Sequence, residues 1–498
     1  MPVKLTDDAS AYVKRLHDRI LRRNVALTQR RDRTSRHGVT APLKEELQLT
    51  SQGVFSTRRR LLAAIAVTAA GGLALAGCTT ANPGSGGNEP TGHQTVTIYG
   101  PDTGTEATEL AASWSAWEKA NDITIKYTGD GNFTTNIATK IQGNDLPDIG
   151  MFPQPGLLSA AIQSGKVSKV GAATEASVKK NFSKDWQGYV TSGGAMYGTP
   201  LDASVKGYIW YTPADFKKWG VDVPKTYSDL VADIGKIETA KGGAPFCAGF
   251  NSGTASGWPG ADFLAEVVLS SAGASTYDSW VSGKTKFTDP AIDKAFTLLG
   301  QILQDPKYVN AGFGDVASIN STAFGDVAAK IADGSCAMTN QATFLEASFS
   351  TTKTAAGAVP KVGADADVWA FPLPSVKSGS NAVVGGGDFA AAFNAKAATQ
   401  KVMTYLSSAD WANSLITVKD ASFISANKGV DASKESDPLL QSAIKTLQSS
   451  TTTFRFGADD AMPTVVENAF WKGIVDWTNG MPQAQAEAEI QAAWANAQ

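Results

Sequence analysis

The residue types that carry most covalent and metal chemistry are scarce in this sequence of 498 residues. The three histidines are His17, His37 and His93, so no imidazole follows His93. This distribution excludes most Ser-His-Asp and Cys-His arrangements, and almost all histidine-based zinc sites, from the rest of the chain. The Ser-x-x-Lys spacing of some acyl transferases occurs four times, without the Ser-Asp-Asn or Lys-Thr-Gly elements that belong with it. Such unaccompanied repeats indicate chance and not a catalytic serine.

Carboxylates are the remaining candidates for catalysis. Residues 1–77 hold 14 Lys+Arg and 6 Asp+Glu, which leaves 30 basic and 41 acidic side chains in the following 421 residues. A glycoside hydrolase needs two carboxylates that flank one bond, and no strand-end arrangement singles out such a pair. Neither a P-loop nor a dinucleotide fingerprint occurs. The acidic balance also disfavours nucleic acid as a partner, because phosphate contacts need clustered Lys and Arg.

The segment STRRRLLAAIAVTAAGGLALAGC, from Ser56 to Cys78, has the order of an export signal: arginines, small apolar residues, then a cysteine. Its 17-residue apolar stretch is short, because a membrane span needs about 20 strongly apolar residues. Its ending resembles a bacterial lipobox, so residues 56–77 are predicted to be a signal peptide and Cys78 an acylated N-terminus. The chain is then exported and lipid-anchored to the outer face of the cell membrane. An uncleaved anchor is the alternative, and Sec and twin-arginine export both stay open.

Residues 1–55 precede this signal and are basic. Either a start codon misassigned upstream of Val54 or a long cytosolic leader explains them, and they are excluded from fold reasoning. Residues 78–94, rich in Gly and Pro, are predicted to be a flexible tether.

The elements that must position a site begin after the tether. Strands are predicted at 96–100, 123–129 and 148–152, with helices at 107–121 and 132–144 between them. This alternation predicts a parallel sheet with ligands at the carboxyl ends of its strands. Two later segments are predicted as a long extended piece and as a loop: GTPLDASVKGYIWY and FRFGADDAMP.

Several motifs occur in the order seen in one protein family. GNDLPDIGMFPQPGLLSAAIQSGKV joins a helix end, a strand and a new helix, and KGYIWYTPADFKKWGVDVPKTYSDL has a Trp-Tyr strand followed by two helices. SGWPGADFLAEVVL, CAMTNQATFL, GGGDFAAAFN and MPTVVENAFWKGIVDW follow in the expected order. Over residues 95–498 the chain therefore resembles bacterial extracellular solute-binding proteins for sugars, of the maltose- and α-glucoside-binding type.

The resemblance implies an α/β, two-lobed, periplasmic-binding-protein-like fold of type II, with the ligand cleft between lobes joined by hinge strands. Lobe 1 is expected to hold residues 95–203 plus 376–427, and lobe 2 residues 204–375 plus 428–498. The extended segment GTPLDASVKGYIWY is then a hinge crossing, where a few residues change φ and ψ during closure.

The same resemblance implies a monomeric substrate-binding lipoprotein of an ABC importer. The protein would capture a sugar, an oligosaccharide or α-glucoside, and deliver it to membrane permease subunits served by a separate ATPase. It implies no cofactor, no metal and no enzymatic activity. The alternatives are a surface-anchored glycoside-acting hydrolase, the same fold with a polyol or other non-sugar solute, and a sensory or adhesion lipoprotein.

Two cysteines, Cys247 and Cys336, remain after Cys78. The oxidising compartment and the family resemblance together favour a disulfide between them, which would stabilise the fold by a few kcal/mol. Two separate buried thiols are the alternative.

A sugar site needs flat aromatic faces for C–H surfaces, and carboxylates, amides and cations for hydroxyls. By position in the family pattern, Trp471 and Phe344 are the first candidates for stacking. Trp471 is also spaced for the buried face of a helix, so core packing is its alternative. The other candidate ligand-binding residues are Phe152, Gln154, Trp258, Asp262, Asp388, Lys206, Asn132 and Asp459.

Overall fold

The computed structural model describes residues 92–377, 379–419 and 423–497. The predicted leader, the signal peptide, the acylated Cys78 and nearly all of the tether lie outside the described residues. Within the described ranges, no helix combines the length and the apolar character that crossing a bilayer requires.

A first sheet, in the order β2-β1-β3-β14-β6, is built largely from the strand–helix alternation. β1 pairs in parallel with both β2 and β3, as predicted, and β14 joins antiparallel to β3 and to β6. The strands are β1 (Gln94–Gly100), β2 (Ile123–Gly129), β3 (Ile149–Phe152), β6 (Gly198–Pro200) and β14 (Phe389–Ala392), with a small hairpin of β4 (Thr191–Ser192) and β5 (Ala195–Met196). The helices of this first lobe are α2 (Gly104–Asn121), α3 (Phe133–Gly143), α4 (Pro155–Gln163), α5 (Ala172–Asn181), α6 (Lys184–Tyr189), α14 (Ala397–Leu406) and α15 (Ala409–Ile416).

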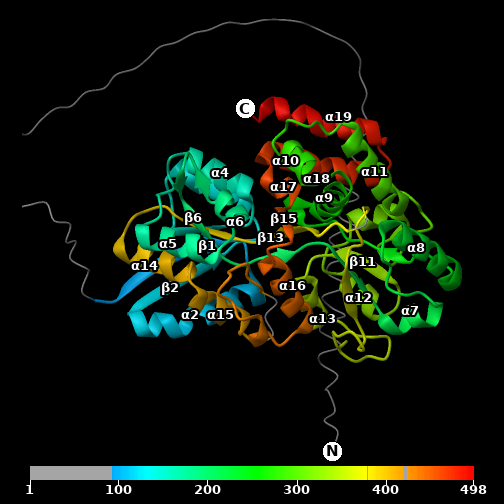
Figure 1. Cartoon of the computed structure of the whole chain (residues 1–498), viewed down its shortest axis with the longest axis horizontal. Helices are drawn as coiled ribbons and strands as arrows, with labels where there is room; N and C mark the ends of the chain where they lie inside the picture. The colour runs from blue at the N-terminus through cyan, green and yellow to red at the C-terminus, as the bar shows by residue number, and fades with distance from the viewer. Residues whose placement is uncertain (1–91, 378, 420–422, 498) are drawn as a thin grey trace, which may run out of the picture. The chain divides into compact units, whose positions relative to one another are not determined.

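A second sheet, in the order β10-β9-β11-β8-β12, forms the other lobe. Its strands are β8 (Tyr208–Tyr211), β9 (Phe246–Cys247), β10 (Val309–Asn310), β11 (Met338–Gln341) and β12 (Trp369–Pro372). Its helices are α7 (Pro213–Trp219), α8 (Tyr227–Lys241), α9 (Trp258–Ala272), α10 (Ala274–Val281), α11 (Pro290–Leu303), α12 (Val327–Ala332), α13 (Leu345–Phe349), α17 (Ala458–Ala461), α18 (Thr464–Thr478) and α19 (Gln483–Ala493). Figure 1 shows the two groups of elements side by side.

Helix α9 lies at the centre of the second lobe, because its sequence is apolar around most of its circumference. It packs against α10, α11, α17 and α18. Residues 259–270 are buried, whereas its first residue, Trp258, is half-buried and lines the cleft described below.

Three short strands connect the lobes and pair as a third sheet in the order β15-β13-β7. They are β7 (Ser204–Val205), β13 (Ala382–Gly386) and β15 (Thr453–Phe456), and α16 (Pro438–Gln448) precedes the last of them. β7 follows β6 of the first sheet and precedes β8 of the second, whereas β13 leads from β12 back to β14. Hinge-type movement would therefore have to bend all three strands.

The prediction that FRFGADDAMP is a loop was wrong. Its first residues form β15 and its middle forms the short helix α17. Phe454 and Phe456 are buried, and both rings pack against Trp186 of α6. The alternation of these two phenylalanines around Arg455 is that of a half-buried strand, a signal too short to stand out beside the Gly-Asp-Asp sequence that follows it.

Cys247 and Cys336 form a disulfide, as predicted, with a Cα–Cα distance of 5.8 Å. Cys247 ends β9 and Cys336 precedes β11, and these two strands are parallel neighbours in the second sheet. The bridge therefore ties together two segments that are 89 residues apart in sequence.

Candidate ligand-binding cleft

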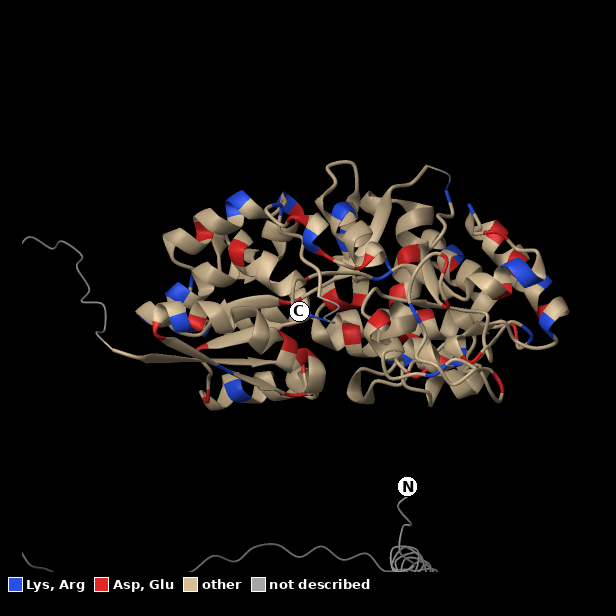
Figure 2. Ribbon diagram, turned by 90° about the horizontal axis from the view of Figure 1, so that it is seen from below, with Lys and Arg blue, Asp and Glu red and all other residues tan. Residues whose placement is uncertain are grey.

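A cleft with a volume of about 540 Å³ opens between the two lobes beside the connecting strands. It is formed by segments that lie far apart in sequence and contains most of the polar and aromatic groups discussed below. Figure 2 shows acidic residues on both lobes, several of them near the middle of the described body. The cleft is lined by Pro101, Asp102, Thr103, Glu106, Gly131, Pro153, Gln154, Asp202, Ala203, Ser204, Lys206, Ser252, Ala255, Trp258, Phe324, Phe344, Ala347, Ser348, Gly386, Gly387, Asp388, Phe423, Asp460 and Trp471.

The first lobe contributes the corners that follow its parallel strands. Asp102 lies between β1 and α2, Gly131 between β2 and α3, and Gln154 between β3 and α4. Parallel strands end at the same edge of a sheet, so these corners meet. Gln154 precedes Pro155, the first residue of α4, where proline is well suited because its missing N–H would have no partner.

Four carboxylates form the first-lobe side of the cleft, and we call them the carboxylate wall: Asp102, Glu106, Asp202 and Asp388. Oδ1 of Asp202 accepts a hydrogen bond from the backbone N–H of Asp388 at 2.9 Å, and the carboxyl groups of the two residues are also hydrogen-bonded to each other. Burial, and next the negative charge of Asp202, raise the pKa of Asp388 well above its usual range. Burial raises the pKa of Asp202 to about 6, although the N–H of Asp388 opposes the shift.

The second lobe contributes three aromatic rings in mutual contact, the aromatic triad: Trp258, Phe324 and Phe344. Ring centroids lie 5.1 Å apart for Trp258 and Phe324, 5.9 Å for Trp258 and Phe344, and 6.2 Å for Phe324 and Phe344. All three are only half-buried and line the cleft. Partly exposed rings held by edge contacts offer a ligand an apolar surface that need not rearrange.

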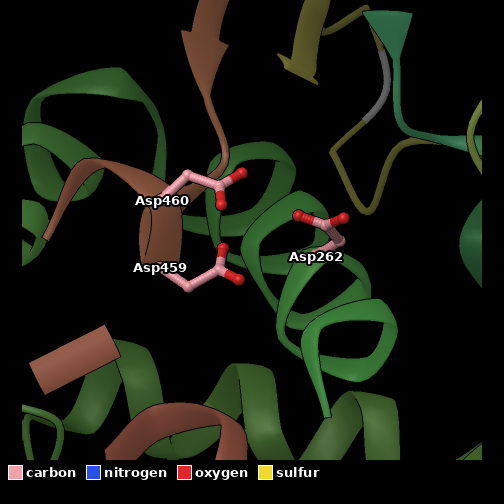
Figure 3. A group of neighbouring side chains, drawn as sticks. All are labelled: Asp262, Asp459 and Asp460. Carbon is pink, nitrogen blue, oxygen red and sulfur yellow. The ribbon is translucent and has the colours of Figure 1, made fainter. Parts of the chain in front are cut away.

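Lys206 follows β7 and is the cationic residue of the cleft lining. Its Nζ donates to Asp262 at 2.8 Å and to Asp460 at 2.6 Å, and lies 5.7 Å from the centroid of the Trp258 ring. Burial lowers the pKa of Lys206, but the charges of Asp262 and Asp460 outweigh burial and raise that pKa overall. Figure 3 shows the carboxyl groups of Asp262, Asp459 and Asp460 converging from α9 and α17.

Asp262, Asp459 and Asp460 are close enough to ligate one metal ion, and within the described ranges no other group of three or more His, Cys, Asp or Glu meets that condition. The Lys206 ammonium already donates to two of them. Two of the three carboxyl groups are therefore already paired with a cation, and a metal would have to displace a buried ion pair.

Two glycines make room for the lysine. A Cβ on Gly386 would lie 2.8 Å from Cε of Lys206, and one on Gly457 would lie 3.0 Å from Nζ and 2.8 Å from Oδ2 of Asp460. Side chains at either position would push the ammonium group away from its carboxylates. The glycine-rich turn before Asp388 thus serves the packing of the lysine.

Six of the ten predicted site residues line the cleft, and four do not. The six that line it are Gln154, Lys206, Trp258, Phe344, Asp388 and Trp471. Trp471 is only 3% exposed, and its Nε1 donates to Asp459 at 2.6 Å, so most of the ring packs in the core of the second lobe. Core packing was the alternative predicted for Trp471 from its spacing on the helix.

The other four predicted residues are placed outside the cleft lining for separate reasons. Phe152 is fully buried, where it packs against Phe133 and Phe393. Asp262 and Asp459 lie behind the surface, bonded to Lys206 and Trp471 respectively. Asn132 is exposed at the start of α3, next to the lining residue Gly131.

Sequence reasoning missed most of the carboxylate wall and one ring of the triad. Asp102 and Glu106 flank the start of α2, and Asp202 lies within the segment predicted as a hinge. Asp102 and Asp202 carry the signal used for other residues, an acidic side chain close to Gly or Pro just after a strand, whereas Glu106 lies within α2. Phe324 had no such signal, because it lies in an irregular segment between helices.

The sequence matches the family model of the bacterial extracellular solute-binding proteins over residues 101–413. The alpha-glucosides-binding periplasmic protein AglE of Rhizobium meliloti (strain 1021) is 30% identical over 416 residues, which cover 80% of this chain and 87% of AglE. The osmoprotective compounds-binding protein GgtB of Synechocystis sp. is 29% identical over 417 residues, which cover 83% of this chain and 94% of GgtB. The fold matches maltose-bound MalE3 of T. maritima with a TM-score of 0.60 and 18% identity over 80% of this chain and 98% of that one.

The family match confirms three predictions: the two-lobed periplasmic-binding-protein fold, an extracellular solute-binding role alongside ABC transporter components, and a binding protein rather than an enzyme. The chain belongs to the bacterial extracellular solute-binding protein family.

Proposed function

We propose that this protein is the receptor of an ABC importer for a carbohydrate, an oligosaccharide or α-glucoside. The observation that carries the proposal is the division of the cleft into an aromatic triad on one lobe and a carboxylate wall on the other. A sugar ring has apolar C–H faces and a rim of hydroxyl groups, so it would use both surfaces at once.

The names of the relatives agree with this chemistry. AglE is named for α-glucosides, GgtB for osmoprotective compounds, and the MalE3 structure contains maltose. The range of these names limits the proposal to the carbohydrate class, with a polyol or other osmolyte as the alternative ligand.

Closure of the lobes is the proposed mechanism, with lobe 1 as residues 95–203 plus 376–427 and lobe 2 as 204–375 plus 428–498. Asp202 and Lys206 flank β7, so a ligand that bonds to the cleft near them touches both lobes next to a hinge strand. A ligand drives closure only if it binds the closed state more tightly than the open one. The closed monomer would then dock on permease subunits that work with a separate ATPase.

Lipid anchoring through Cys78 is part of the proposal, on the strength of the lipobox-like sequence. Metabolic labelling with a fatty acid tests it directly. The wild-type protein should incorporate label and fractionate with membranes, and Cys78→Ser should lose both properties. Label that persists in the variant would contradict the assignment.

Calorimetric titration with maltose, trehalose, sucrose and a maltooligosaccharide tests the binding proposal. We expect at least one of them to bind and to be recovered intact. Trp258→Ala should weaken that binding, because this half-buried ring of the triad lines the cleft. Tyr405→Ala, which removes a ring stacked on Trp117 away from the cleft, is the matched control. Cleavage of the sugars, or failure of the whole panel to bind, would refute the proposal.

A further inference from the structure

Asp102 lines the cleft from the turn of residues 101–103, which joins β1 to α2. Among the described residues, the backbone of Asp102 is hydrogen-bonded to one side chain, that of Tyr127 in β2. The N–H of Asp102 donates to the Tyr127 hydroxyl at 2.9 Å, and this hydroxyl donates to the carbonyl oxygen of Asp102 at 3.2 Å. A hydroxyl can do both, because it has one donor and two acceptor lone pairs. One oxygen atom therefore holds the turn.

The alternation of side chains along β2 directs Tyr127 to this turn. Ile123, Ile125 and Tyr127 are separated by two residues each, so they share one face of the sheet. On that face α2 supplies Trp114, whose ring centroid lies 6.3 Å from that of Tyr127. Tyr127 is the last of the three before the strand ends. Its ring therefore packs against the core of the first lobe, while its hydroxyl reaches the turn that follows the neighbouring strand β1.

A pair of glycines makes room for this arrangement. Gly100 and Gly129 are the last residues of β1 and β2 and are partners in the parallel register. A Cβ on Gly100 would lie 2.7 Å from the hydroxyl oxygen of Tyr127, and one on Gly129 would lie 1.8 Å from the carbonyl oxygen of Asp102. Neither glycine has a positive φ. The close approach of the hydroxyl and the carbonyl, and not the local backbone conformation, therefore requires glycine at these two positions.

The Tyr127 hydroxyl is suited to hold the turn and not to bind the ligand itself. Burial, and next the negative charge of Asp102, raise the pKa of Tyr127 well above its usual range, so the hydroxyl keeps the proton that it donates. Of the two residues, only Asp102 lines the cleft. An influence of Tyr127 on a ligand would therefore pass through Asp102.

A binding loop that is not ordered beforehand must be ordered when the ligand binds, and this ordering lowers the affinity. We propose that Tyr127 is a positioning residue for ligand binding: its hydroxyl fixes the backbone of Asp102, so that the Asp102 carboxyl group bonds to sugar hydroxyls without a prior rearrangement. The proposal rests on the carbohydrate function above and adds a residue that sets the affinity of that site.

Tyr127→Phe removes one oxygen atom and keeps the ring on Trp114. Calorimetry on the purified full-length protein measures its affinity for whichever of maltose, trehalose, sucrose and the maltooligosaccharide the wild-type protein binds most tightly. We expect about tenfold weaker binding, which is about 1.4 kcal/mol and the order of one to two hydrogen bonds. Tyr405→Phe is the matched control in the same lobe, because its hydroxyl bonds to Ser113 outside the cleft lining, and it should change the affinity by less than about twofold.

A double-mutant cycle separates positioning from a general loss of stability. Asp102→Ala removes the carboxyl group and should itself weaken binding by about tenfold. In that background, Tyr127→Phe should change the affinity by no more than about twofold, because the group that it positions is gone. Circular dichroism and urea unfolding check that each variant is folded at the temperature of the titration. A merely structural role would lower the stability and leave the affinity of the folded protein unchanged.

Gly129→Ala disturbs the same contact from the other side. Its Cβ would displace the carbonyl oxygen of Asp102 from the Tyr127 hydroxyl, so it should weaken binding about as much as Tyr127→Phe does. Gly143→Ala is the control, because this glycine is also exposed and in the first lobe, and an added Cβ there meets no atom within 4 Å.

Unchanged affinity in Tyr127→Phe, or in Asp102→Ala, would overturn the positioning role and leave the carbohydrate function standing. An equal loss from Tyr127→Phe with and without the Asp102 carboxyl group would show that Tyr127 does not act through Asp102, and would overturn the role as well. A wild-type protein that binds no sugar of the panel would instead refute the proposed function, and with it this role of Tyr127.

Discussion

Lys206→Met removes the ammonium group from the buried acidic cluster but keeps most of the aliphatic side chain. In the wild-type protein, Nζ lies 2.8 Å from Asp262 and 2.6 Å from Asp460, and all three side chains are largely withdrawn from solvent. Breaking a buried ion pair by removing one partner costs about 3–5 kcal/mol, because the other charge stays buried without compensation. We expect the free energy of unfolding to fall by about this amount at neutral pH.

The loss should depend on pH in a defined direction. Burial already raises the pKa of Asp262, and removing Lys206 removes the charge that opposes this rise. A carboxyl group whose folded pKa exceeds its unfolded value of about 4 holds its proton longer in the folded state, so stability falls as the pH rises above about 4. The variant should therefore lose less stability at about pH 5 than at about pH 8.

Urea unfolding followed by tryptophan fluorescence measures both effects. Lys140→Met is the matched control, because its ammonium also lies 2.8 Å from an aspartate, Asp145, but at the surface. Exposed pairs of this kind are worth about 0.2–1 kcal/mol. A loss for Lys206→Met no larger than that of the control, or an equal loss at both pH values, would refute the assignment of Lys206 as the internal counter-ion.

Three further outcomes follow from the structure. Trp471→Ala should lower the free energy of unfolding, measured with urea, by about 3–5 kcal/mol, because the ring is 3% exposed and its indole N–H donates to Asp459. A variant as stable as the wild-type protein would show that the ring is not part of the core. Reduction of the Cys247–Cys336 disulfide should lower the free energy of unfolding by about 2–4 kcal/mol, measured with and without reductant. The double variant Cys247→Ala/Cys336→Ala is the control, and reductant should not change its stability. Burial raises the pKa of Glu266 to about 8, so this residue should make the free energy of unfolding fall between about pH 5 and pH 8, by up to about 1.4 kcal/mol per pH unit. A Glu266→Gln protein whose free energy of unfolding falls equally steeply with pH would contradict this.

Local sequence patterns predicted the first five elements of the fold well. Strand and helix periods at residues 96–152 matched β1, α2, β2, α3 and β3, because each element is amphipathic or bounded by Gly, Pro or Asn. The prediction failed at β15, where Phe454 and Phe456 are too few to form a visible pattern. Their strand is held by β13 and by Trp186, and neither neighbour is local in sequence.

Site residues were predicted less completely, and the reason is geometric. Sequence patterns indicate that a side chain is at a strand end, but whether it faces the cleft depends on the packing behind it. Asp388 follows Gly387 and Asp262 lies two residues after Gly260, yet Asp388 lines the cleft and Asp262 turns inward to Lys206. The same uncertainty separates Trp258, which is half exposed, from Trp471, which is buried.

The sequence by itself determined the chemistry that this protein lacks and the class of fold that it adopts. A chain with no histidine after His93 lacks most histidine-dependent catalytic and zinc arrangements, and its alternating strands and helices predict an open α/β scaffold. Only the tertiary structure decided that Asp202 meets Asp388, 186 residues away, and that Lys206 is neutralised by Asp262 and Asp460. These contacts depend on the pairing of three connecting strands between the two lobes. Pairing between segments so far apart in sequence produces no periodic pattern of residues.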